Sequence, residues 1–373
     1  MMQRKYCIAD NKSEINHLHT FKNFPLKVGC TDSNMSGDKY FDMVWGASEN
    51  GIVQLMELID LDLLYSDTHN PGAIGKVWEK HHQDFSNFIG RNINEKKILE
   101  IGGASGILVN FFLDTDLNFR WDIVEPSKQK FDDDRINFFN CLFENFSSKE
   151  KYDYVINSHL LEHVYNPLEF LTSVNNYLNL GGIQFISIPN IEHWLKKGYS
   201  NSLNFEHTYF YNQKVIEHLL RSTGFHIDKI IEGTHSIFIK CIKVQSVKNV
   251  DVEKQFLEID SENIFLNYID SLNNSVEEIN NLNAKEYSIF LFGGHIFSQI
   301  LLNIGVNEDC IIGILDNDPN KIGKRLYGYN QKVFSPSEIK FHKNPCVVIK
   351  AGVYSSEISK QLIEINPKTK IIF

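Results

Sequence analysis

The sequence of 373 residues has little of what marks nucleic-acid-binding, exported or membrane proteins. Lys and Arg number 37 against 47 Asp and Glu, the net charge is -10, and no cluster of basic residues is present. This balance argues against binding to nucleic acid phosphates. The first 20 residues are polar, and no apolar run reaches the ~18 residues that can span a bilayer. We expect a cytoplasmic protein with neither nucleic acid nor membrane as a partner.

Cysteine is also sparse. The six cysteines are scattered singly, without a CxxC spacing for zinc or a dense disulfide framework. A hydrophobic fraction of 42% and a charged fraction of 23% are ordinary for a folded globular protein. The chain is longer than a usual single domain, so we expect two or three domains.

Strand and helix patterns alternate through the middle of the chain, which predicts an α/β fold with a mostly parallel sheet and covering helices. An amphipathic helix is expected to begin at Pro71, because apolar residues recur there at spacings of three and four. Strands are expected over 97–101, 121–124, 152–157, 183–188, 227–231 and 237–243, and helices over 105–114, 167–178 and 212–223.

A second α/β pattern follows a polar segment near residue 250. Between the two, apolar residues from Phe265 to Ile279 repeat at four, three, four and three, which predicts a domain-linking helix or a short dimeric coiled coil. A homodimer therefore stays open. The predicted division is a small N-terminal domain over 1–70, a ligand-binding α/β domain over 71–245, a linking helix over 246–286 and a Rossmann-like domain over 287–373.

A glycine-rich turn follows the strand over 97–101. Such a turn lets a ligand lie against bare backbone at the strand end. An acidic residue, Glu125, ends the next strand, where a carboxylate can accept hydrogen bonds from ribose hydroxyls. Gly-Lys-Ser/Thr is absent, which weakens a P-loop interpretation, whereas a dinucleotide site stays open on these residues alone.

The segments 152–164 and 178–190 closely resemble the class I S-adenosylmethionine-dependent methyltransferases, and Glu100, Gly102 and Gly106 match the first motif of that family. The resemblance implies a transferase with S-adenosylmethionine as cofactor and S-adenosylhomocysteine as product. The residues implied at the cofactor are Glu100, Gly102, Gly103, Gly106, Glu125, Pro126, Ser158 and His159.

Three further segments, 51–55, 205–210 and 315–324, are similar to methyltransferases that C-methylate keto deoxysugars carried on nucleotides. The resemblance implies a nucleotide-linked sugar as substrate, with His207 as base and Glu206 as its partner. It implies a Rossmann-like C-terminal domain that helps to hold the nucleotide. The residues implied at the substrate are Asn190, Asn204, Gly294, His295 and Asp316.

Two departures from that family modify the expectation. Ala47 and Asn50 replace one of the family's cysteine pairs, and Cys7 with Cys30 cannot supply the four ligands of a tetrahedral zinc site, so we predict no metal. Asn204 stands where C-methylating members carry Tyr. Because methylation of a hydroxyl requires only a base such as His207, we favour O-methylation of a sugar, with C-methylation of a ketosugar as the alternative.

Structural alternatives accompany these assignments. His159 can equally be a satisfied core histidine, and for His163 the opening of a helix is preferred over a catalytic role. For His81 and His82, a core or surface position is favoured. The C-terminal glycine turn can belong to a Rossmann unit used only for packing. A non-catalytic nucleotide-binding module is the alternative from outside the enzymes.

Overall fold

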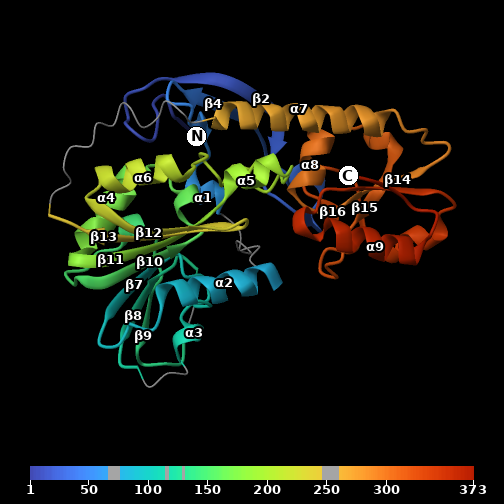
Figure 1. Cartoon of the computed structure of the whole chain (residues 1–373). Coiled ribbons are helices and arrows are strands. Elements are labelled where there is room, and N and C mark those ends of the chain that lie inside the picture. Colours follow the sequence, from blue (N-terminus) through green and yellow to red (C-terminus); the bar gives the residue numbers. More distant parts are fainter. Residues whose placement is uncertain (66–75, 114–116, 128–130, 246–259) are drawn as a thin grey trace.

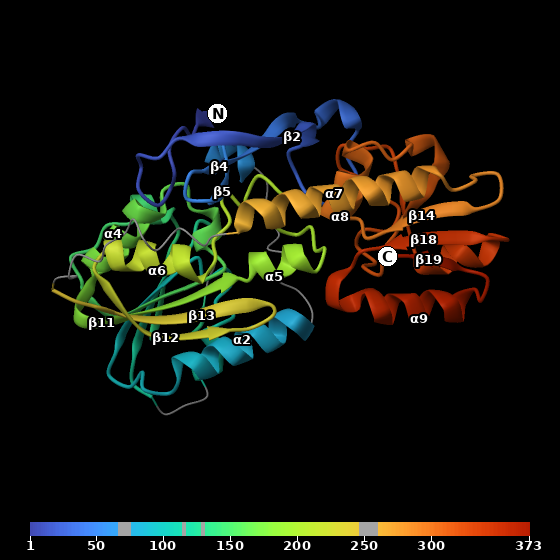
Figure 2. The same ribbon diagram turned by 45° about the horizontal axis from the view of Figure 1, so that its top comes forward.

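The computed structural model describes residues 1–65, 76–113, 117–127, 131–245 and 260–373. Two α/β units are joined by a long helix, and the N-terminal strands lie against both units (Figures 1 and 2). The predicted helix start at Pro71 and the predicted domain boundaries near residues 70 and 246 fall outside the described ranges.

The larger unit is built on a seven-stranded sheet with the order β12-β13-β11-β10-β7-β8-β9. The two pairs made by β13 are antiparallel, and the other four pairs are parallel. This arrangement confirms the predicted α/β fold with a mostly parallel sheet. The strands are β7 (Lys97–Ile101), β8 (Arg120–Val124), β9 (Ile136–Phe139), β10 (Tyr152–Ser158), β11 (Leu178–Pro189), β12 (Phe225–Glu232) and β13 (Ser236–Lys243).

Helices cover both faces of this sheet, with α2 (Lys76–Ile89) and α3 (Asn110–Leu113) on one face and α4 (Pro167–Tyr177) and α6 (Gln213–Ser222) on the other (Figure 1). The helix predicted over 105–114 is wrong in its length. Residues 104–109 form turns, and Ala104 and Gly106 have φ of 46° and 75°, values that an α-helix does not allow.

The N-terminal unit contains an antiparallel sheet of β2 (Ile15–Pro25), β4 (Tyr40–Ser48) and β5 (Val53–Leu55), followed by α1 (Leu61–Leu64). Short strands β1 (Met2–Gln3) and β6 (Glu57–Leu58) pair beside it. The edge strand β5 bonds to a distant segment, since Leu55 N donates to Thr208 O over 2.9 Å and Phe210 N donates to Val53 O over 2.8 Å. The N-terminal sheet therefore fixes the backbone that directly follows His207.

The long helix α7 (Ser261–Asn280) runs beside α5 (Ile191–Lys196) toward the C-terminal unit (Figure 2). Its apolar seam is buried within the chain, where Phe265 packs against Trp45 and Phe210 with ring centroids 5.8 and 5.9 Å apart. The seam predicted from the sequence thus packs on the chain itself. Neither α7 nor any other described helix has the length and apolarity needed to cross a membrane.

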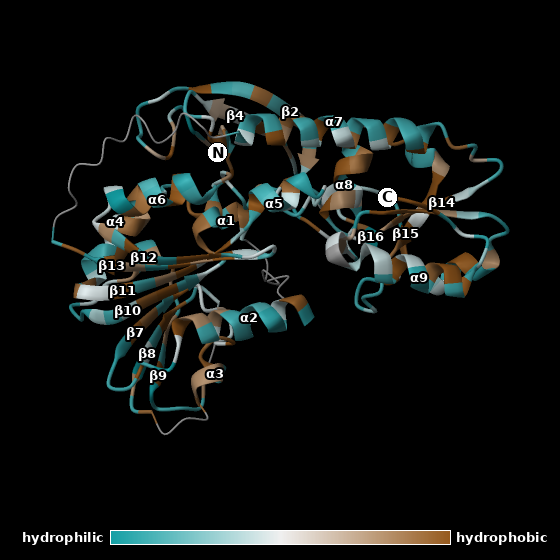
Figure 3. Ribbon diagram, in the orientation of Figure 1, coloured by the Kyte–Doolittle hydropathy of each residue, from teal (hydrophilic) through white to brown (hydrophobic). Residues whose placement is uncertain are grey.

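The C-terminal unit has a parallel sheet with the order β17-β15-β14-β18-β19. Its apolar strands are buried, as are those of the larger sheet, and the polar residues lie on the outer helix faces (Figure 3). Its elements are β14 (Ser288–Phe292), α8 (Ile296–Asn303), β15 (Ile311–Leu315), β17 (Val333–Phe334), β18 (Pro345–Ile349), α9 (Ser355–Ile365) and β19 (Lys370–Ile372).

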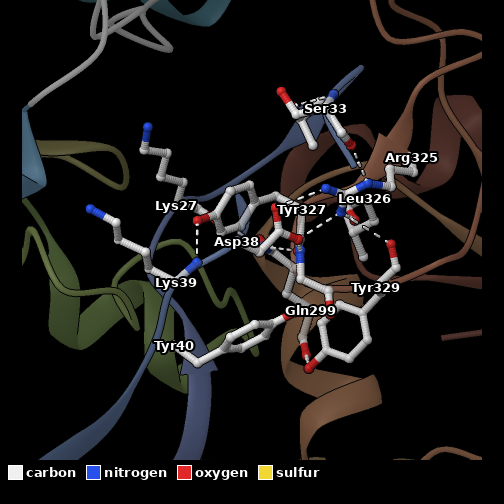
Figure 4. A network of polar contacts seen from close by, with 12 residues as sticks. Lys27, Ser33, Asp38, Lys39, Tyr40, Gln299, Arg325, Leu326, Tyr327 and Tyr329 are labelled. Carbon is white, nitrogen blue, oxygen red and sulfur yellow. Dashed lines mark hydrogen bonds and ion pairs between the residues drawn. The ribbon is translucent and has the colours of Figure 1, made fainter. Parts of the chain in front are cut away.

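A network of polar contacts attaches the C-terminal unit to the N-terminal one (Figure 4). Strand β3 (Cys30–Thr31) pairs with β16 (Arg325–Leu326). The Asp38 side chain is 1% exposed and binds both terminal nitrogens of Arg325 over 2.7 and 2.8 Å. Gln299 Nε2 donates to the carbonyls of Lys27 and Tyr327, each over 2.9 Å. A bidentate, buried pair of this kind fixes the orientation of the two units.

Candidate active site

The residues predicted at the cofactor gather at one edge of the larger sheet. The glycine turn follows β7, Glu125 follows β8, and Ser158 and His159 end or follow β10. These three strands are parallel, so their carboxyl ends meet at the same edge. Ligands of open α/β sheets bind at this edge.

Close packing and backbone conformation explain why glycine occupies three positions of the turn. Gly102 and Gly106 have φ of 73° and 75°, which glycine adopts without steric cost. A Cβ on Gly103 would lie 2.7 Å from the Ile123 side chain and 2.9 Å from the Glu100 carboxyl carbon. The backbone of the turn therefore lies directly on the sheet.

Glu100 supports this turn from the interior of the domain. It is 3% exposed and accepts a hydrogen bond from Trp121 Nε1 over 2.8 Å. Burial raises its pKa to about 7. Its carboxyl group packs under Gly103, so its contact is with the backbone of the turn.

Glu125 is half-buried beside the turn. Its Oε2 accepts from Ala104 N over 3.1 Å, and its Oε1 accepts from the backbone N and the hydroxyl of Ser127 over 3.1 and 2.9 Å. A carboxylate has about four acceptor positions, so these bonds leave room for a further donor. Pro126, which was predicted at the cofactor, is exposed next to it.

Three histidines surround the hydroxyl of Ser236. The distances to Ser236 Oγ are 2.7 Å from His235 Nδ1, 2.8 Å from His159 Nε2 and 3.1 Å from His81 Nδ1. Burial lowers the pKa of all three rings, to about 3 for His81 and well below its usual range for His159. The indole of Trp78 covers the group.

The sequence indicated only part of this histidine group. Ser158 and His159 were predicted at the cofactor. For His81 a core or surface position was favoured, and the residue is indeed buried, with 4% of its surface exposed. His81 Nε2 nevertheless lies 3.1 Å from Ser158 Oγ, which links α2 to the end of β10. His235 was not identified, because no local signal connects positions that are far apart in the chain.

A second group consists of two carboxyl groups and two imidazoles, from Glu162, His163, Glu206 and His207, which we call the acid-base group. His163 Nε2 lies 3.9 Å from Glu162 Oε1, and His163 Nδ1 lies 3.8 Å from Glu206 Oε2. The rings of His163 and His207 are 5.0 Å apart. Burial raises the pKa of Glu162 to about 8 and lowers that of His207 to about 4.

His207 has one ring nitrogen that is buried and bonds to no described residue. Its ring bonds to the backbone of Ser202, and its Nδ1 has no hydrogen-bond partner among the described residues. At neutral pH the low pKa keeps this ring uncharged. A buried imidazole nitrogen with a lone pair is the form that a general base requires.

Asn204 shapes the turn that carries Glu206 and His207. Its Oδ1 accepts from the backbone N of both residues over 2.8 and 2.9 Å, and its Nδ2 donates to Asn201 O over 2.9 Å. These bonds occupy the side chain that was predicted to bind substrate. The direct contribution of Asn204 is to orient the two residues that follow it.

Arg4 was missed by sequence reasoning and holds the same segment from the N-terminal side. Its guanidinium is buried and donates to Thr208 O over 2.7 Å and to Tyr165 O over 2.8 Å. Desolvation lowers its pKa to about 10. The sequence near Arg4 gives no local indication of such contacts, because Thr208 and Tyr165 lie 204 and 161 residues away.

Asn190 was also predicted to bind substrate, and its amide is engaged within the chain. It caps α5 by accepting from His193 N over 3.1 Å. It also donates to Glu232 Oε1 and to Gly233 O over 3.1 and 2.9 Å. The three contacts fix the loop between β12 and β13, directly before His235.

The C-terminal glycine turn repeats the pairing seen at Glu125. Gly294 N donates to Asp316 Oδ2 over 2.8 Å, and Lys321 Nζ binds the same oxygen over 3.0 Å. A Cβ on Gly294 would lie 2.6 Å from Cys30 Sγ, so this turn packs tightly against the N-terminal unit. His295 is exposed at the start of α8. A role of these residues toward nucleotide stays a prediction.

Two groups of described residues have the composition of metal ligands. One combines His81, His159 and His235, and the other combines Glu162, His163 and His207. Within each group, one potential ligand atom per residue lies within 4.8 Å of the others. The prediction of no metal was based on the cysteines alone, and it stays a prediction.

Comparison with known families agrees with this geometry. Residues 76–230 match the family model described as a methyltransferase domain. This part of the chain is a methyltransferase domain. Its large, mostly parallel sheet is typical of the Rossmann-like fold of class I S-adenosylmethionine-dependent methyltransferases, and the match to this domain is consistent with an enzyme. Residues 285–372 match a second model, described as C2185-like, N-terminal.

Similar folds occur among solved structures. The 1,6-didemethyltoxoflavin-N1-methyltransferase of Burkholderia thailandensis, solved with that compound and S-adenosylhomocysteine, is 14% identical over 52% of this chain and 95% of its own, with a TM-score of 0.40. A S-adenosylmethionine-dependent methyltransferase of Mesorhizobium loti is 13% identical over 46% and 100%, with a TM-score of 0.36. The N-methyltransferase NodS of Bradyrhizobium japonicum with S-adenosylhomocysteine is 14% identical over 50% and 94%, with a TM-score of 0.33.

A search of curated proteins finds no match to this chain.

Proposed function

We propose that the enzyme transfers a methyl group from S-adenosylmethionine to a sugar hydroxyl, and that a nucleotide carries the sugar. The observation that carries this proposal is the uncharged His207, whose Nδ1 lacks a hydrogen-bond partner among the described residues and lies in a group with two carboxyls and a second imidazole. A polyhydroxylated acceptor supplies the donors and acceptors that such a group needs.

The residues of the sheet edge fit the cofactor. Glu125 lies beside the turn from Gly102 to Gly106 and retains an acceptor position for a ribose hydroxyl. When bound, S-adenosylmethionine supplies a methyl group already activated by its sulfonium. The enzyme's contribution is therefore to position the acceptor and to exclude water.

His207 would take the proton of the acceptor hydroxyl on Nδ1, and the bound S-adenosylmethionine would supply the methyl group that this oxygen receives. Since the pKa of His207 is about 4, the ring releases this proton readily. His163 and Glu206, 3.8 Å apart, offer a path for it toward the partly exposed carboxyl of Glu206.

Asn204 favours oxygen over carbon as the acceptor. Its side chain is engaged in the turn before His207, so this position presents no phenol or other acid-base group to the acceptor. Removal of a proton from carbon next to a ketone needs such additional help, whereas a hydroxyl needs only a base. C-methylation of a nucleotide-linked ketosugar is the alternative.

Product analysis tests the proposal. The purified enzyme is incubated with S-adenosylmethionine and a panel of keto and non-keto nucleotide sugars, and mass spectrometry and NMR locate the methyl group. A methyl ether formed by the wild type and lost in His207→Asn is the expected result. A C-methyl product establishes the alternative. Binding of S-adenosylhomocysteine without turnover of any sugar favours a non-catalytic nucleotide-binding module.

A further inference from the structure

We propose that His81, His159 and His235 bind one transition-metal ion of the zinc type. The three imidazoles come from separate parts of the enzyme: α2, the loop after β10 and the residue before β13. Each directs one ring nitrogen at the same point, the position of Ser236 Oγ, from 2.7 to 3.1 Å away. Convergence of three imidazole nitrogens on one point is the arrangement of a three-histidine metal centre.

The Ser236 hydroxyl can hydrogen-bond to all three ring nitrogens only if the rings differ in which nitrogen carries the proton. A serine hydroxyl has one proton and two lone pairs, so two of the rings must donate to it while the third accepts. A metal ion bonds to all three nitrogens in the same manner. Zinc-nitrogen bonds of ~2.0–2.1 Å require each ring to move inward by about 1 Å or less, with the Ser236 hydroxyl turned aside or bound as the fourth ligand.

Groups that orient metal-binding histidines are present behind two of the rings. His81 Nε2, on the far side of its ring, lies 3.1 Å from Ser158 Oγ. His159 Nδ1 lies 3.5 Å from Glu162 Oε1, which is buried and has no hydrogen-bond partner among the described residues. A carboxyl oxygen behind a histidine can accept from its second ring nitrogen and so orient the ring toward the metal.

The surroundings select the class of ion. All three direct ligands are imidazole nitrogens, which suit zinc, copper and nickel, whereas calcium and magnesium require oxygen ligands. The ring of Trp78 lies 4.8 Å from that of His159 and 5.1 Å from that of His235, so an apolar wall shields one side of the site. Metal there would join α2 to the edge of the sheet.

Metal titration of the full-length enzyme tests this site. Protein treated with a chelator is titrated with Zn²⁺ by calorimetry, and Co²⁺ is added in parallel to record its visible absorption in a four-coordinate nitrogen site. We expect one ion per chain. His235→Ala should weaken Zn²⁺ binding by more than ~100-fold, because loss of a direct ligand exceeds the ~10–100-fold cost of losing a group that only orients one.

His226→Ala is the matched control, since this histidine is exposed on β12 and pairs with Ile242 of β13. It should bind Zn²⁺ as the wild type does. His81→Gln provides a second ligand variant, and circular dichroism confirms that each variant is folded. The proposal is overturned if the wild type binds no Zn²⁺ or if folded His235→Ala and His81→Gln bind it unchanged.

His207→Ala separates the histidine group from the acid-base group. If the ion binds at the proposed site, this variant keeps Zn²⁺ affinity within a few-fold of the wild type, while turnover falls. Loss of Zn²⁺ binding in His207→Ala, with retention in His235→Ala, places the ion in the acid-base group and refutes the proposal. Because the readout is metal binding, a failure of the proposed sugar substrate leaves this result unaffected.

Discussion

Replacement of Glu162 by Gln should make the stability of the enzyme less sensitive to a rise in pH from about 5 to about 8. The Glu162 side chain is 0% exposed, its Oε1 has no hydrogen-bond partner among the described residues, and its Oε2 receives only a long bond of 3.4 Å from the Tyr211 hydroxyl. Burial raises its pKa from 4.5 to about 8. The folded protein therefore keeps a proton that the unfolded chain releases.

The sign of the effect follows from proton counting. Between pH 4.5 and about 8 the folded state binds more protons at this site than the unfolded state does, so the free energy of unfolding falls as pH rises. At ~1.4 kcal/mol per pH unit, the loss over this window is at most about 5 kcal/mol. Gln resembles the protonated acid in shape and charge, so Glu162→Gln should avoid this loss.

Urea unfolding at a series of pH values, followed by tryptophan fluorescence, measures the effect. The variant and the wild type should have similar unfolding free energies near pH 5, and the variant should become more stable by several kcal/mol near pH 8. Glu144→Gln, at an exposed position, is the control and should keep the wild-type pH profile. A difference between Glu162→Gln and the wild type that is constant across this range would refute the reasoning.

Four further predictions concern the active site and its support. His207→Asn should lower kcat by at least ~100-fold in a methyl-transfer assay, because the general base is lost, while calorimetry shows unchanged S-adenosylhomocysteine affinity. Glu125→Ala should weaken that affinity by ~10–100-fold, since a hydrogen bond to a charged acceptor contributes ~1.5–3 kcal/mol, with an unchanged circular dichroism spectrum. Arg4→Met should lower kcat more than it changes KM, because the backbone carbonyls beside His207 lose their buried donor; equal kcat in the folded variant would contradict the positioning role. Arg325→Met should reduce the free energy of unfolding by ~3–5 kcal/mol in denaturant titrations, because it leaves the Asp38 carboxylate buried without its partner.

The two glycine turns show how similar local sequences acquire different surroundings. In both, an acidic residue at the end of the second strand accepts from a backbone N of the turn: Glu125 from Ala104 over 3.1 Å and Asp316 from Gly294 over 2.8 Å. Asp316 is further bound by Lys321, and its turn packs against the N-terminal unit. The sequence predicts the turn in each case, and the tertiary neighbours determine how much of it a ligand can reach.

Local patterns in the sequence were sufficient for the framework of the enzyme. Apolar runs and their alternation with amphipathic segments predicted the main strands of the larger sheet and the presence of a second α/β unit, because the burial of strand and helix faces is encoded at short range. The same patterns failed for the short strands β9, β17 and β19, which have two to four residues and gain their stability from neighbouring strands. They also failed over 105–114, where positive φ at Ala104 and Gly106 delays the helix.

Only the tertiary structure decided which side chains meet. His81, His159 and His235 are distant in sequence, as are Arg4 and Thr208, and no periodicity relates them. Their contacts depend on the strand order of the large sheet and on the pairing of the N-terminal sheet with the segment after His207. The sequence by itself therefore determined the main elements and the glycine turn, since these depend on neighbouring residues. The histidine group and the contacts of Arg4 with the segment after His207 arise from long-range packing, in which each contact depends on the position of every element between its partners.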